Sequence, residues 1–76
     1  MIQKTDDKEF LLDTAVKIRK LRIEAGFSNA KDFAREIEMH ESYYRQIESG
    51  KINITLLILK RILDYHKLSI EFFLKK

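Results

Sequence analysis

The sequence predicts an all-α fold, a compact bundle of five helices, and three observations support this prediction. Apolar residues recur at the three- and four-residue spacing of helices, and no segment alternates as a strand does. Only two glycines and no proline interrupt the chain, so Gly26 and Gly50 divide it into thirds. Because a chain of 76 residues can form only one small core, we expect a single domain over residues 1–76.

The first third predicts one long helix over about residues 6–25. Acidic residues in its first turn suit the positive end of the helix dipole, and Gly26 suits a left-handed helix stop. The apolar residues at helical spacing, which should face the core, are Leu11, Ala15, Ile18, Leu21 and Ala25.

The middle third predicts two short helices, separated by three residues that have no periodicity. Asn29 is a good N-cap and Asp32 follows three residues later, so a helix of about two turns is expected over residues 30–37. A second helix is expected over residues 41–49, where Gly50 stops it.

The last third predicts a strongly apolar helix and a final short turn. Thr55 can cap a helix that runs through about Tyr65. Ser69, with Glu71 in the first turn, begins a last helical turn that ends near Leu74. The connections between all five helices are short, which favours a compact bundle.

The composition excludes several classes of protein. Without cysteine the chain has no disulfide framework, zinc finger or iron–sulfur site, which favours a reducing, cytoplasmic setting. Charged residues make up 36% of the chain and its first residues are polar, so we expect neither a membrane span nor a signal peptide. The net charge of +3 favours a polyanionic partner only mildly, because residues 28–51 carry four cations and five anions. The surplus lies in residues 52–76.

The sequence also argues against catalysis and against a bound metal. Four serines occur with His40 and His66, but a bundle of this size leaves little room for a pocket in which nucleophile, base and orienting acid converge. Two isolated histidines and no cysteine provide no metal-ligand cluster. We therefore expect no enzyme activity, no cofactor, no metal and no small-molecule substrate.

Two short helices joined by about three residues, the second with a polar outer face, are typical of a helix-turn-helix unit. Specific runs sharpen this prediction: IRKLR at 18–22, GFS at 26–28, FA at 33–34, SYYRQIESGK at 42–51, LKRI at 59–62 and SIEFF at 69–73. In this order they closely resemble the Cro and lambda-repressor-like (XRE) family of bacterial and phage DNA-binding domains, over about residues 14–74. Residues 6–13 then form an N-terminal helix extension. The resemblance implies a lambda-repressor-like bundle whose second and third helices form the helix-turn-helix.

The resemblance further implies which residues contact DNA. In this family the third helix lies in the major groove, with its N-terminal residues at the base edges. At these positions Gln46 can pair with adenine and Arg45 with guanine. Glu41 can accept a hydrogen bond from cytosine, and Ser42 can bond to more than one base. Glu41 can equally well serve only the helix dipole. The residues expected at the phosphate backbone are Asn29, His40, Tyr43 and Lys51.

The resemblance also pairs Arg22 of the first helix with Glu48 of the third, which would fix the angle at which the third helix is presented. The alternative is that Glu48 is a charged side chain exposed to solvent.

Three positions depart from the family. The family often has a phosphate-binding glutamine at the start of its second helix, where the nearest residue here is Ala30. Ile54 replaces a proline that the family usually has soon after the second glycine. Glu38 replaces the usual turn glycine, at a cost on the order of 1 kcal/mol if the left-handed geometry is kept.

Apolar residues that a single packed helix face cannot bury suggest a homodimer through the fourth helix and the last turn. Such a dimer would place two recognition helices about 34 Å apart on a pseudo-palindromic operator. Its expected interface residues are Leu57, Ile58, Ile70 and Phe73. The same surface supports an alternative, a helical protein-interaction module without specific DNA reading, such as an antitoxin-type domain that binds a toxin. The sequence favours a sequence-specific, double-stranded-DNA-binding transcriptional regulator that represses by occupying an operator.

Overall fold

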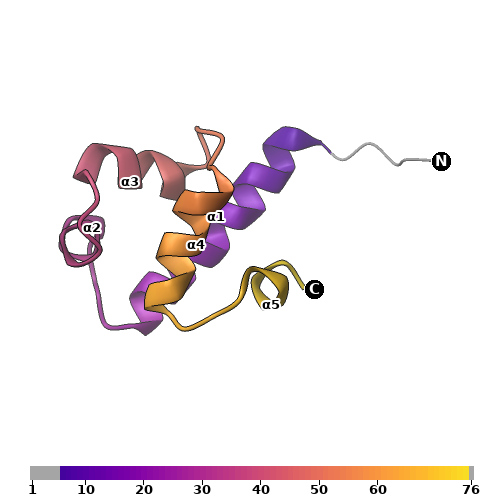
Figure 1. Ribbon diagram of the computed structural model, residues 1–76. Coiled ribbons are helices and arrows are strands. Elements are labelled where there is room, and N and C mark those ends of the chain that lie inside the picture. The colour runs from indigo at the N-terminus through magenta and orange to yellow at the C-terminus, as the bar shows by residue number, and fades with distance from the viewer. Residues whose placement is uncertain (1–5, 76) are drawn as a thin grey trace.

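The computed structural model describes residues 6–75, and this part of the chain forms five α-helices and no strand. The helices are α1 (Asp7–Glu24), α2 (Ala30–Glu36), α3 (Glu41–Ser49), α4 (Leu56–Tyr65) and α5 (Ile70–Leu74). The all-α prediction is confirmed, and every predicted helix lies within about a residue of its observed bounds. Figure 1 shows α2 and α3 together at one end of the molecule and α5 at the other. No helix among the described residues has the length and apolar character that crossing a bilayer requires.

Four of these helices have a polar side chain as their N-cap. Asp6, Asn29, Thr55 and Ser69 each accept a hydrogen bond from a backbone N–H in the first turn of the helix that follows. Each such cap satisfies a donor that the helix itself cannot pair, which stabilises the helix by about 1 kcal/mol. At α3 the cap residue is His40, whose side chain makes no such bond.

The turn between α2 and α3 contains a left-handed residue that is not glycine. Glu38 has a φ of 56°, so the turn keeps its left-handed geometry despite the side chain. An arginine of α4 supports it: Arg61 Nη2 donates to the backbone carbonyl oxygens of Ile37 and Glu38, at 2.7 and 2.9 Å. These two bonds tie the helix-turn-helix to α4, 23 residues further along the chain.

The core is centred on Phe33 of α2. Its ring centroid lies 5.2 Å from those of Phe27 and Tyr65, and 5.3 Å from that of Tyr44. The imidazole of His66 stacks on the same ring, 5.3 Å away and nearly parallel. Around this aromatic group the buried apolar side chains come from all five helices. They are Ala15, Ile18, Phe33, Ala34, Ile37, Tyr44, Ile47, Leu59, Ile62, Leu63 and Phe73.

Exposed apolar side chains lie on α1, α4 and α5, and those of α4 and α5 are not all the ones that the sequence predicted. Leu57 is 78% exposed, in agreement with the prediction. Phe73 is only 6% exposed, so its prediction as an interface residue is corrected: it faces the core, and its neighbour Phe72 is 63% exposed instead. Ile58 and Ile70 are half-buried and pack against the core. The five-residue α5 therefore presents Phe72, not Phe73, to solvent.

Candidate nucleic-acid interface

The two faces of α3 differ sharply in chemistry. Tyr44 and Ile47 point into the core and are 0% and 4% exposed. The opposite face presents Ser42, Arg45 and Gln46 to solvent. Gly50 ends the helix with a φ of 74°, a left-handed conformation that favours glycine. A nine-residue helix with one buried apolar side and one exposed polar side can dock against the core while offering hydrogen-bonding groups outward.

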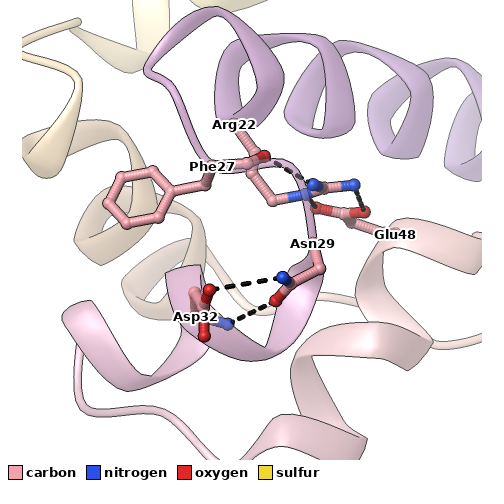
Figure 2. A network of polar contacts seen from close by, with 5 residues as sticks. All are labelled: Arg22, Phe27, Asn29, Asp32 and Glu48. Carbon is pink, nitrogen blue, oxygen red and sulfur yellow. Dashed lines mark hydrogen bonds and ion pairs between the residues drawn. The ribbon is translucent and has the colours of Figure 1, made fainter.

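A buried ion pair joins α1 to α3. Arg22 donates from Nε and Nη2 to the two carboxylate oxygens of Glu48, at 2.7 and 3.1 Å, and both side chains are more than 90% buried. Arg22 Nη1 donates to the carbonyl oxygen of Phe27, at 2.7 Å (Figure 2). The hydrogen bond to Glu48 raises the pKa of Arg22, so the pair stays ionised. Because a bidentate pair fixes direction as well as distance, it sets the orientation of α3 relative to α1.

The hydroxyl of Tyr44 lies buried beside this pair. Burial raises the pKa of the Tyr44 hydroxyl, and the neighbouring carboxylate of Glu48 raises it further. The phenol therefore stays neutral next to the ion pair. The inner side of α3 combines one charged pair with neutral, close-packed groups.

Two of the predicted base-reading residues bind each other. Arg45 donates from Nε to a carboxylate oxygen of Glu41, at 2.7 Å, and Nη2 of the same guanidinium lies equally close. The side chains are 58% and 41% exposed and lie one helical turn apart. An exposed pair of this kind contributes well under 1 kcal/mol, so DNA can displace it at little cost. Gln46 differs, because its side-chain amide has no hydrogen-bond partner within residues 6–75.

The four predicted phosphate contacts do not form one group. Asn29 is occupied: its Oδ1 accepts from the backbone N–H of Asp32 at 2.9 Å, and its Nδ2 donates to the Asp32 carboxylate at 3.2 Å (Figure 2). His40 is exposed at the start of α3, and Lys51 is exposed just after its end. Tyr43 is half-buried and packs against the core. The candidates thus lie at the two ends of α3, with Asn29 acting as a helix cap.

Sequence reasoning missed Arg61, which holds the turn that aims α3. It donates to backbone carbonyl oxygens at the end of α2, and because every residue carries such an oxygen, no sequence pattern identifies them as acceptors.

Among residues 6–75 no three histidine, aspartate or glutamate side chains come together in a way that could hold a metal ion.

A two-helix unit with a buried inner side, a left-handed turn and an exposed polar outer helix is a helix-turn-helix. The helix-turn-helix family model (HTH_3) matches residues 18–73, which is more than half of the chain. The chain belongs to this family, in its XRE-type branch.

Among characterised proteins, the chain is similar to Control protein C.MunI from a Mycoplasma species. The two are 39% identical over 46 residues, which is 60% of this chain and 62% of that protein. The match therefore spans less than two thirds of the relative's length. No solved structure matches this chain.

Proposed function

We propose that this chain is a DNA-binding transcriptional regulator that reads a specific double-stranded operator with α3 and represses transcription by occupying that operator. The observation that supports this most directly is the exposed polar face of α3, held at one angle by the buried Arg22–Glu48 pair. A fixed angle matters because discrimination between bases depends on hydrogen bonds with defined geometry at the groove floor. Such a regulator would act in the compartment that holds the DNA, which agrees with the cytoplasmic setting that the sequence favours.

In this proposal the side chains of α3 divide the work of recognition. Gln46 reads adenine, and Arg45 reads guanine once it leaves Glu41. Glu41 accepts from cytosine, and Ser42 tolerates several bases. The phosphate contacts come from His40, Tyr43 and Lys51, while Asn29 serves as the cap of α2.

We place the dimer interface on the exposed apolar residues of α4 and α5. Leu56 and Leu57 are 70% and 78% exposed, and Phe72 is 63% exposed. Covering such side chains is favourable at about 25 cal/mol per Å² of apolar area. A two-fold arrangement would set two copies of α3 on successive major grooves of a pseudo-palindrome.

The test is selection of bound duplexes from a random pool, followed by sequencing. A recovered palindrome supports sequence reading and the dimer together, whereas no enrichment favours a protein-interaction module, such as one that binds a toxin. Gln46→Ala should then lose preference at one base pair per half-site, with Asp13→Ala on the exposed side of α1 as the control.

Leu57→Lys tests the dimer separately, by sedimentation at micromolar protein. The variant should be monomeric and should bind a half-site as the parent does. If the parent itself sediments as a monomer at every concentration, the dimer is excluded and the reading role of α3 is unaffected.

A further inference from the structure

A polar hollow of about 360 Å³ lies between α1, α2 and α3, beside the base-reading face. Three of the residues that line it are arginines, one from the middle of α3 and two from α1, against a single carboxylate. The polar and charged side chains that line the hollow are Arg19, Arg22, Asn29, Arg45, Glu48 and Ser49. The hollow therefore has a surplus of positive charge.

The arginines of the hollow differ in what they bind. Arg22 is neutralised by Glu48, and Arg45 by Glu41. Arg19 is exposed and forms no ion pair within residues 6–75. Its neighbours one helical turn away are Ala15, Val16, Arg22 and Ile23, so no acidic side chain of α1 can reach it at helical spacing.

The position of the hollow indicates what enters it. Arg45 and Ser49 lie on the outer side of α3 and also line the hollow, so the hollow borders the base-reading face. When a helix lies in the major groove, the sugar–phosphate backbone runs along its flanks. The group nearest this hollow would then be a backbone phosphate.

The uncharged polar side chains that line the hollow, Asn29 and Ser49, already have hydrogen-bond acceptors within the protein. Both ends of the Asn29 amide are bound to Asp32, the oxygen to its backbone N–H and the nitrogen to its carboxylate. Ala30, the next residue, also lines the hollow and carries only a methyl group. A guanidinium, by contrast, offers parallel N–H donors that match two phosphate oxygens.

We propose that Arg19 binds a backbone phosphate in this hollow and so anchors α1 to the DNA strand that flanks α3. This inference rests on the proposed function, because it requires α3 to lie in the major groove. It assigns to α1 a direct contact with DNA, in addition to its role as the support of α3 through Arg22.

The experiment measures affinity for the selected duplex as a function of salt, for the parent and three variants. Arg19→Ala should reduce the magnitude of the slope of log Kobs against log salt by about 0.9 and weaken binding to all sequences alike. Lys20→Ala is the matched control, because it removes the same charge from the same helix but is not among the residues that line the hollow. It should leave the slope unchanged. Arg19→Lys should keep most of the slope, because it keeps the charge.

Ethylation of single phosphates gives a second, positional readout. One ethylated phosphate per half-site should interfere with binding by the parent and not by Arg19→Ala. An unchanged slope for Arg19→Ala, or equal losses for Arg19→Ala and Lys20→Ala, overturns the inference while the proposed function stands. If the parent binds no duplex specifically, both are overturned. Circular dichroism checks that each variant is folded; if Arg19→Ala is not, Arg19→Gln, which removes the charge and keeps a long side chain, takes its place in both measurements.

Discussion

The helix-turn-helix end of the molecule contains a buried ion pair, whereas the ion pair of the α4–α5 end is exposed. At the first end the Arg22–Glu48 pair has side-chain exposures of 6% and 9%. At the other end the Lys60–Asp64 pair of α4 has exposures of 61% on both side chains, while Leu57 stands in solvent beside it. A buried bidentate pair fixes an angle, whereas an exposed pair contributes little to stability. The helix-turn-helix end is therefore oriented by polar contacts, and the far end leaves apolar side chains exposed.

The largest expected effect comes from breaking the buried pair. Arg22→Met leaves the Glu48 carboxylate buried without a partner, so we expect the free energy of unfolding to fall by about 3 kcal/mol. In a domain of this size that lowers the melting temperature by roughly 15 °C, measurable by circular dichroism.

The double variant Arg22→Met/Glu48→Leu is the control for this prediction, since it removes both charges. It should recover most of the lost stability. A melting curve of Arg22→Met that matches the parent would show that the pair does not orient α3.

The two glycines should respond differently to alanine, although both have positive φ. A Cβ at Gly50 would lie 2.9 Å from Leu12 Cδ2 and 3.2 Å from Leu12 Cα, whereas a Cβ at Gly26 meets nothing within 4 Å. We expect Gly50→Ala to cost about 2 kcal/mol or more and Gly26→Ala about 1 kcal/mol, by urea unfolding. Equal losses would mean that α1 moves away from the end of α3 without cost.

The turn that aims α3 should depend on α4. Arg61→Met removes two hydrogen bonds to the carbonyls of Ile37 and Glu38, and we expect a loss of about 1 kcal/mol in urea unfolding. Adding Glu38→Gly should restore stability, because glycine adopts the left-handed φ of 56° without strain. Lys60→Met, which breaks only the exposed pair, serves as the control. No difference between the two methionine variants would contradict the role of Arg61.

The smallest expected effect is a pH dependence that originates at His66. Burial lowers the pKa of His66 from 6.5, so the unfolded chain takes up the proton first as the pH falls. Stability is then complete above pH 6.5 and decreases as the pH falls below that value, by less than about 1 kcal/mol because the ring is only half-buried.

Unfolding free energies at pH 7.5 and 5.5 test this pH dependence. The difference between the two values should be smaller in His66→Gln than in the parent, and His40→Gln should behave as the parent does. A parent whose stability rises between pH 7.5 and 5.5 would contradict the prediction.

Local features of the chain were predictable because they depend on neighbouring residues. The caps at Asn29, Thr55 and Ser69 and the stops at Gly26 and Gly50 act within a turn of their own position, and each lies where the sequence places it. The family resemblance added the partnership of Arg22 with Glu48, which no spacing along one helix could reveal.

Other features could not be predicted because they depend on which way a short element rotates or on a distant backbone. Phe72 and Phe73 are equally apolar, and only the docking of α5 decides that Phe73 is buried. The bonds from Arg61 to the turn at Glu38 span 23 residues and end on carbonyls that every residue carries. The same holds for Arg19, whose hollow exists only where three helices meet.

The sequence by itself thus determined the helices, their ends and the family, because capping, glycine conformation and apolar periodicity act over a few residues. Only the tertiary structure decided which arginine is buried against a carboxylate from another helix. Arg22, Arg45 and Arg19 are identical in chemistry, yet one is buried against Glu48, one lies against Glu41 and one lies open beside α3. Packing brings the Glu48 carboxylate to Arg22, whereas Glu41 reaches Arg45 through the spacing of one turn within α3. Neither effect brings a carboxylate within 4 Å of Arg19 in residues 6–75.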